Sequence, residues 1–204
     1  MTMTEEEKFW EWFKKNNSKY YFLNQILDEP KKEELLDDFL RHLHEYCNSL
    51  FFEIGGIPKE GQELIITAGG NKEYFAKAEQ LVSKAPKIDE WEIKALKPPM
   101  GIDFVSRYEG VELNPNEIWF LPLDNEEDPK SLGLRICLEN YDPKNEELYL
   151  NASYQLLDTI LGERSAALDI SYVEVDRLSQ NPKKEGLIEL SDLPQYIAWR
   201  KTKV

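Results

Sequence analysis

The sequence predicts an α+β protein in which a ββαβ unit occurs twice in tandem, preceded by two N-terminal helices. Two observations lead to this fold class. Two extended apolar runs, an amphipathic helix and a third extended run fill residues 50–97, and the same order returns over residues 118–177. We therefore expect an extended sheet of mixed and antiparallel pairing, with the helix of each unit packed on one face.

These elements divide the chain into three segments, which we expect to form a single compact domain. Residues 1–48 make an N-terminal helical segment, and residues 49–101 make the first ββαβ unit. Residues 102–204 hold a connector, the second ββαβ unit and a short C-terminal helix. A chain of 204 residues can bury a core that needs neither disulfides nor a metal.

The N-terminal helices are indicated by caps and by helical spacing of apolar residues. Thr4 and Glu7 form a capping box for the first helix, and the second begins near Pro30. The aromatic stripe of the first helix is either a docking face against the main body or a partner surface. That stripe consists of Phe9, Trp12 and Phe13. We expect the two helices to cover the sheet's other face or one of its edges.

The first unit shows a strand pattern on both sides of a helix pattern. Residues 50–54 and 63–67 are typical of strands, and Asn71 is suited to cap the following helix. Pro86 ends that helix. Residues 91–95 alternate between apolar and charged side chains, which predicts a half-buried strand.

The second unit repeats this order after a connector that includes a small strand within residues 104–113. Its first strand covers residues 118–123. Pro122 has no backbone donor, so this strand is expected at a sheet edge or to end there. The remaining elements are a strand over 132–138, a helix from about Asn145 to Gly162, and a strand over 170–178.

Acidic charge is the main functional signal. The formal net charge is −14, and residues 109–147 hold eleven acidic against three basic residues. Such a surface repels phosphate backbones, so we expect no nucleic-acid binding, and it favours a basic protein partner. An immunity or inhibitor protein against a basic toxin would suit this charge; solubility alone is the other explanation. The candidate partner-binding residues are Asp124, Glu126, Glu127, Asp128, Glu139 and Asp142.

No catalytic, cofactor-binding or metal-binding residues are predicted. His42 and His44 lie two positions apart on a helix and therefore face different directions. The acidic loop that begins at Asp124 resembles a calcium loop, but it carries Pro129 where that loop requires glycine. A solvated hairpin tip explains the loop better. We therefore expect a non-catalytic interaction protein.

A small-molecule-binding protein or enzyme that uses the open sheet face is the alternative hypothesis. Arg135 and Cys137 lie on one face of a strand, about 7 Å apart. A nearby cation can lower the pKa of a thiol, although a catalytic cysteine normally also needs a histidine. With Glu174, these residues define the alternative pocket; a simply packed Cys137 is the competing interpretation.

The composition predicts a cytoplasmic protein that does not enter the membrane. No apolar run approaches the ~18 residues that a spanning helix needs. The N-terminus is acidic and lacks the basic and apolar regions of a signal peptide. Cys47 and Cys137 both lie in apolar segments, which favours a reducing compartment.

Several short stretches resemble a family of uncharacterised acidic bacterial cytosolic proteins. The resemblance is carried by residues 52–55 (Phe-Glu-Ile-Gly), residues 63–71, Ala85-Pro86, Trp91 and residues 97–101 (Lys-Pro-Pro-Met-Gly). It covers about residues 50–104. The resemblance implies a bacterial, intracellular setting and brings no activity, cofactor or site with it.

Overall fold

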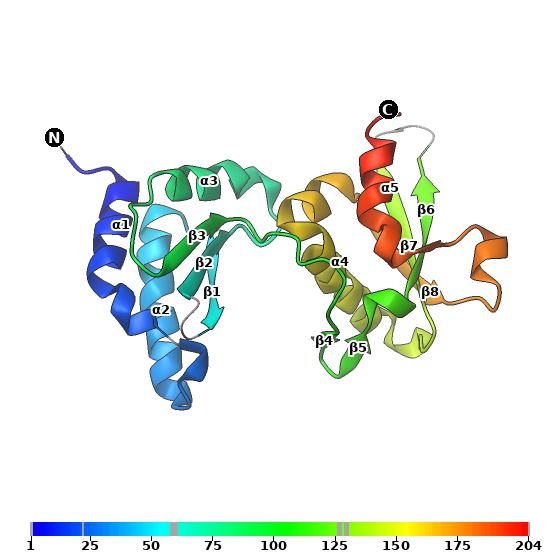
Figure 1. Ribbon diagram of the computed structural model, residues 1–204, viewed down its shortest axis with the longest axis horizontal. Coiled ribbons are helices and arrows are strands. Elements are labelled where there is room, and N and C mark those ends of the chain that lie inside the picture. Colours follow the sequence, from blue (N-terminus) through cyan, green and yellow to red (C-terminus); the bar gives the residue numbers. More distant parts are fainter. Residues whose placement is uncertain (1, 22, 58–60, 126–127, 129–130, 204) are drawn as a thin grey trace. The chain divides into compact units, whose positions relative to one another are not determined.

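The computed structural model of the protein describes residues 2–21, 23–57, 61–125, 128 and 131–203 (Figure 1). These residues form five α-helices and three sheets, so the mixed helix and strand composition is confirmed. The chain divides into two compact units, unit 1 (residues 1–97) and unit 2 (residues 98–204), whereas we expected a single compact domain.

Within the described residues, the strands do not join into the one extended sheet that we expected. They form a three-stranded sheet in unit 1, and a two-stranded and a four-stranded sheet in unit 2. The chain leaves the unit 1 sheet through Pro98 and Pro99. Proline has no backbone N–H, so this connector is poorly suited to continue a ladder of strand hydrogen bonds.

The first N-terminal helix of unit 1 begins at the predicted cap, and the second begins near Pro30 as expected. In α1 (Glu5–Asn16), the Glu7 backbone N–H donates to Thr4 Oγ1 over 3.3 Å, and the Thr4 N–H donates to Glu7 Oε2 over 2.8 Å. The capping box is therefore confirmed. In α2 (Glu29–Tyr46), Asp28 caps the helix and proline occupies the first turn.

The unit 1 sheet has the strand order β1-β2-β3. β1 (Phe51–Ile57) is antiparallel to β2 (Gly61–Thr67), and β2 is parallel to β3 (Trp91–Ala95). The helix α3 (Phe75–Ser83) connects the two parallel strands. Because side chains alternate along a strand, one face of the sheet carries apolar residues and the other carries charged ones, among them Glu63, Glu92 and Lys94.

All three helices of unit 1 cover the same face of this sheet, so the N-terminal helices do not occupy the other face or an edge as expected. On that face, Phe39 of α2 stacks on Phe52 with ring centroids 4.0 Å apart. The helix α1 also reaches α3, because Trp10 Nε1 donates to the Leu81 carbonyl over 2.8 Å. The helices share one layer because they share one apolar cluster.

Phe39 lies at the centre of this cluster and is fully buried. It makes edge-on contacts with rings of α1 and of the turn that follows, at centroid distances from 5.3 to 5.8 Å. These rings belong to Phe9, Trp12, Phe13 and Tyr20. The aromatic stripe of α1 is therefore a docking face against the main body.

Unit 2 contains a short hairpin and a four-stranded sheet. The hairpin joins β4 (Ser106–Tyr108) to β5 (Val111–Leu113). The sheet has the order β8-β7-β6-β9, with β6 antiparallel to both β7 and β9, and β7 parallel to β8. The bounds of its strands are Trp119–Asp124 for β6, Leu132–Leu138 for β7, Tyr172–Arg177 for β8 and Ile188–Glu189 for β9.

Two helices pack on one face of the unit 2 sheet. The side chains of Phe120, Leu134 and Val173 form one buried cluster with residues of α4 (Glu146–Asp169) and α5 (Leu193–Arg200). The opposite face carries Arg135 and Glu174, because side chains alternate along a strand.

Pro122 and Gly162 were the two residues of unit 2 at which we expected an element to end or a strand to lie at an edge. β9 pairs only with Trp119 and Phe120, so Pro122 lies on the part of β6 whose outer side has no strand partner among the described residues. β6 lies between β7 and β9 and continues past Pro122 to Asp124, whereas we expected an edge strand or a strand that ends at Pro122. Proline is tolerated there because the pairing with β9 stops at Phe120. Gly162, with the non-helical angles φ 75° and ψ 155°, separates two helical segments of α4, so the first segment ends where we expected. The second segment, which was not expected, follows it to Asp169 and packs Ala166 against the core.

Truncating Phe39 to alanine is expected to lower the free energy of unfolding by about 3–5 kcal/mol, because it opens a cavity among the aromatic rings. Urea unfolding followed by circular dichroism measures this loss. Phe51→Ala removes a ring that is 48% exposed and serves as the control, with an expected loss below about 1 kcal/mol. Equal losses for the two variants would contradict the central position of Phe39.

The Asp38 carboxylate is expected to make stability depend on pH. Partial burial opposes its ionisation, but hydrogen bonds from Arg41 (2.5 Å) and Tyr20 (3.1 Å) outweigh burial and hold its pKa below the ordinary value. This stabilisation is present above the unfolded pKa of about 3.9 and is lost as pH falls through the folded value.

Asp38→Asn should therefore cost about 1 kcal/mol at neutral pH, and its deficit relative to the natural protein should shrink in acid. Thermal unfolding at several pH values between about 3 and 7, a range that includes the pKa of an unfolded aspartate, measures this deficit. Asp37→Asn, at an exposed neighbouring position, is the control. A deficit that does not change with pH would count against ionic pairing at Asp38.

Candidate functional site

The residues predicted to bind a partner occupy different structural positions in unit 2. Asp124 ends β6, and its Oδ1 accepts a hydrogen bond from Arg200 Nη1 over 2.5 Å. Asp142 caps the turn before α4, with Oδ1 accepting from the Lys144 N–H over 3.1 Å. Asp128 and Glu139 are exposed. Glu126 and Glu127 lie outside the described residues.

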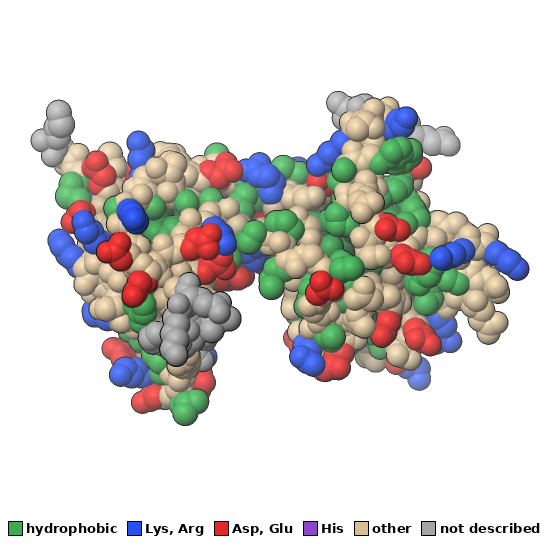
Figure 2. Space-filling model, in the orientation of Figure 1, with side chains coloured by type: hydrophobic (Ala, Val, Ile, Leu, Met, Phe, Trp, Pro, Cys, Tyr) green, Lys and Arg blue, Asp and Glu red, His purple; other side chains and the backbone are tan. Residues whose placement is uncertain are grey.

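On the face shown in Figure 2, acidic side chains are scattered over unit 2 among basic and apolar ones rather than joined into one patch. Three residues of the acidic segment nevertheless line one hollow of about 210 Å³, called here the unit 2 hollow. They are Glu112, Glu117 and Glu139. The hollow is also lined by Tyr149, whose hydroxyl donates to the Asn140 carbonyl over 2.9 Å.

The alternative pocket residues lie on the exposed face of the unit 2 sheet. Arg135 and Glu174 are direct neighbours across β7 and β8, and Arg135 Nε donates to Glu174 Oε1 over 2.5 Å. Glu174 also accepts a hydrogen bond from the Tyr172 hydroxyl over 3.2 Å. The arginine and the carboxylate therefore satisfy one another.

Cys137 lies on the same face but is buried. Burial, followed by the charge of Asp176, raises the pKa of its thiol to about 11, and the opposing effect of Arg135 is smaller. The thiol is consequently protonated at neutral pH, and a protonated thiol is a poor nucleophile. This geometry does not support an activated cysteine at this position.

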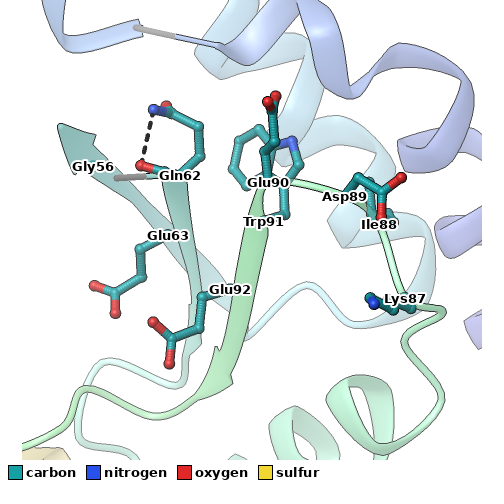
Figure 3. A pocket seen from close by; sticks show the side chains of 10 residues that line it. Gly56, Gln62, Glu63, Lys87, Ile88, Asp89, Glu90, Trp91 and Glu92 are labelled. Atoms are coloured by element: carbon teal, nitrogen blue, oxygen red, sulfur yellow. Dashed lines mark hydrogen bonds between the residues drawn. The ribbon is translucent and has the colours of Figure 1, made fainter. Parts of the chain in front are cut away.

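A hollow in unit 1 was not predicted from the sequence. This unit 1 pocket, of about 660 Å³, lies at the beginning of β2 and β3 (Figure 3). Its walls are formed by Gly56, residues 61–63 and residues 87–92. These two segments become neighbours only through the parallel pairing of β2 with β3, in which Glu63 is the partner of Glu92.

The backbone holds the walls of the unit 1 pocket in position. Glu90 has a left-handed backbone with φ 68°, and its carbonyl accepts a hydrogen bond from the Gln62 N–H over 2.7 Å. The Tyr21 hydroxyl donates to Glu90 Oε2 over 2.6 Å. A Cβ added at Gly61 would lie 3.2 Å from the Glu90 carbonyl oxygen, so glycine permits this close approach.

Negative charge dominates the lining of the unit 1 pocket. Four carboxylates line it, from Glu63, Asp89, Glu90 and Glu92, and Lys87 is the one cation among the described lining residues. Lys94, on the exposed sheet face, pairs with Glu63 and lies 3.2 Å from a Glu92 carboxylate oxygen. Figure 3 shows Glu63 and Glu92 side by side, pointing in the same direction.

Trp91 also lines this pocket, with only 8% of its surface exposed. Its ring makes edge-on contacts with Phe13 and Tyr21. Its indole Nε1 has no hydrogen-bond partner among the described residues. A buried donor without a partner costs about 1–3 kcal/mol.

Two general searches complete the description of the site. The described residues contain no group of three or more His, Cys, Asp or Glu side chains placed to hold a metal ion. None of the described helices is both long enough and apolar enough to span a bilayer. Comparisons with protein families, with curated proteins and with solved structures gave no match to the chain.

Cys137 is expected to react with iodoacetamide far more slowly than Cys47 at neutral pH, because it is buried and its pKa is raised, whereas Cys47 is partly exposed. Mass spectrometry of the alkylated peptides measures both rates. Urea-unfolded protein, in which the rates should converge, is the control. Preferential labelling of Cys137 in the folded protein would revive an activated thiol.

Proposed function

We propose that the protein is a non-catalytic interaction protein whose acidic unit 2 surface binds a basic protein partner. The observation that carries this proposal is that three acidic residues, Glu112, Glu117 and Glu139, line the unit 2 hollow. Unit 2 contains 20 acidic and 11 basic residues, a formal charge of −9. A field of this sign speeds encounter with positively charged molecules.

The local contacts of these carboxylates support the proposal. Glu112 pairs with Arg107 over 2.6 Å, which orients its carboxylate and partly offsets its charge. Glu117 accepts a hydrogen bond from Asn114 Nδ2 over 2.9 Å, which orients its carboxylate without a counter-charge. Glu139 is exposed beside them. Exposed ion pairs contribute little free energy, so a cation of the partner can replace Arg107 at Glu112, or share that carboxylate with it, at small cost.

The proposal extends to the origin of the fold: unit 1 and unit 2 contain copies of one ββαβ module. The support is a shared pairing scheme, in which the first two strands are antiparallel and the last pairs in parallel with the second. Each connecting helix also begins in the same way. Asn71 Oδ1 accepts from the Glu73 N–H and Asp142 Oδ1 from the Lys144 N–H, both over 3.1 Å.

A reducing compartment such as the cytoplasm is part of the same proposal. Its support is that Cys47 and Cys137 are free and that Cys137 is buried as a small apolar side chain.

A fluorescent lysine-rich peptide is a direct probe of this function. Its affinity for the whole protein should fall as salt is raised, and it should be about fivefold weaker for the double variant Glu112→Gln with Glu139→Gln. Fluorescence anisotropy measures both effects. The matched control neutralises Glu33 and Glu34, two exposed carboxylates of α2. Equal losses in both double variants would reject a specific role for the unit 2 hollow.

A further inference from the structure

The exposed face of the unit 2 sheet is apolar along β6. Because side chains alternate along a strand, Trp119, Leu121 and Leu123 lie on the face opposite to Phe120 and its core cluster. All three are partly exposed. A sheet that has helices on one face and water on the other normally carries polar residues at such positions. Apolar residues on both faces of β6 are instead typical of a strand that is covered on both sides.

Tyr172 extends this apolar surface across β7 to β8. Its partner in the register is Gly133, whose partner on the other side is Leu123. A Cβ placed on Gly133 would lie 3.1 Å from the Leu123 Cβ and 3.6 Å from the Tyr172 ring, so the two side chains flank the glycine closely. Tyr172 is 53% exposed. We call the following residues the unit 2 sheet patch: Trp119, Leu121, Leu123 and Tyr172.

The middle of the face, beside the patch, is electrically neutral. Arg135 lies opposite Leu121 and pairs with Glu174 across β7 and β8. The Tyr172 hydroxyl donates to the same carboxylate over 3.2 Å. A partner segment that lies over the middle of the face therefore meets apolar side chains and an ion pair that is already formed.

Negative charge predominates where β7 and β8 end. Burial, followed by the charge of Asp176, raises the pKa of the Cys137 thiol, and Glu185 acts in the same direction, so both carboxylates lie near this residue. Lys183 lies over the Trp119 ring, 5.6 Å from its centroid. The charged side chains that these contacts place on the face are four carboxylates and two cations, a net charge of −2: Glu174, Asp176, Glu185, Glu189, Arg135 and Lys183.

The printed hydrogen bonds of Asp176 and Glu185 come from uncharged groups. Asp176 Oδ1 accepts from the Arg177 N–H over 2.7 Å, and Glu185 Oε1 accepts from the Ser179 hydroxyl over 2.6 Å. These contacts orient the two carboxylates without neutralising them. Both residues are exposed, so a cation of a partner can reach them.

An amphipathic basic helix fits this face better than other occupants. A second copy of the chain would bring its own net charge of −14 to an acidic face and would be repelled. An extended segment would pair with the backbone of an edge strand such as β8 rather than lie on a face. A helix with an apolar stripe and basic flanks matches both the patch and its acidic border, and it would give the sheet helices on both faces.

We propose that the unit 2 sheet patch docks an amphipathic helix of the basic partner. The apolar stripe of that helix packs on the patch, and its lysine or arginine side chains reach Asp176 and Glu185. This inference rests on the proposed function and deepens it, because it gives the structural class of the partner segment and a contact surface lined by other residues than the unit 2 hollow.

Fluorescence anisotropy with a labelled helical peptide tests the proposal on the whole protein. The peptide has about 18 residues, or about five turns, with leucines that form one stripe and lysines elsewhere. A comparison peptide has the same composition in an order that breaks the stripe. The striped peptide should bind about tenfold more tightly, because only it presents its leucines together. Equal affinities would overturn the proposal.

The deciding variant is Leu121→Thr with Tyr172→Thr, which removes apolar surface and keeps residues suited to strands. It should bind the striped peptide about tenfold more weakly, whereas Phe51→Thr, at an exposed strand position of unit 1, should bind it unchanged. Asp176→Asn with Glu185→Gln should weaken binding about threefold. Unchanged melting temperatures show that the variants fold. An equal loss in Phe51→Thr, or no loss in the charge variant, would overturn the proposal.

Two measurements on the natural protein need no variant that folds. In hydroxyl-radical footprinting, the striped peptide should protect Trp119 and Tyr172 from oxidation and leave Phe51 reactive. An unprotected Tyr172 would overturn the proposal. In sedimentation of the protein alone, a monomer is expected, and a dimer whose formation protects Tyr172 would show that a second copy covers the patch, which also overturns the proposal.

The two proposals fail in different ways. Binding of lysine-rich peptide that depends on Glu112 and Glu139, without preference for the striped peptide, would overturn the sheet patch and leave the proposed function standing. Absence of binding by every cationic peptide at low salt would overturn both.

Discussion

The contact between Phe39 and the rings around it organises unit 1. Because this side chain touches rings from α1, from the following turn and from β1, the two N-terminal helices must lie on the face of the sheet that carries Phe52. That face is also covered by α3, which α1 reaches through the Trp10 hydrogen bond to Leu81. The Phe39 cluster therefore lies on one side of the sheet, and the opposite face carries the ion pair of Glu63 and Lys94.

Much of the secondary structure could be predicted because its causes are local. The capping box of Thr4 and Glu7, the alternation along β3 and the cap at Asn71 each depend on residues within a few positions. The division into separate sheets depends instead on which strands meet, and adjacent sequence does not specify that. At Gly162 the local signal ends one helical segment as predicted, but the second segment that follows and packs Ala166 against the core could not be read from that signal.

The candidate sites were harder to predict for the same reason. The acidic segment was evident, but Asp124 is engaged by Arg200, 76 positions away, and Asp142 by the cap of α4. Cys137 has the expected neighbour Arg135, yet burial has the larger effect on its pKa. The unit 1 pocket requires the register between β2 and β3, which joins two segments with no shared motif.

The exposed sheet faces explain why the unit 1 pocket and the unit 2 hollow both lie near strand ends. In each unit a basic side chain pairs with a carboxylate across the parallel strands, Lys94 with Glu63 and Arg135 with Glu174. Such pairs neutralise the middle of each face, so a cation arriving there would have to compete with one already present. Carboxylates beyond the pairs, at Glu90 before β3 and at Glu139 after β7, keep more of their attraction for an incoming cation. Under the proposed function, a basic partner is therefore held at carboxylates near the ends of the strands rather than at the middle of a sheet face.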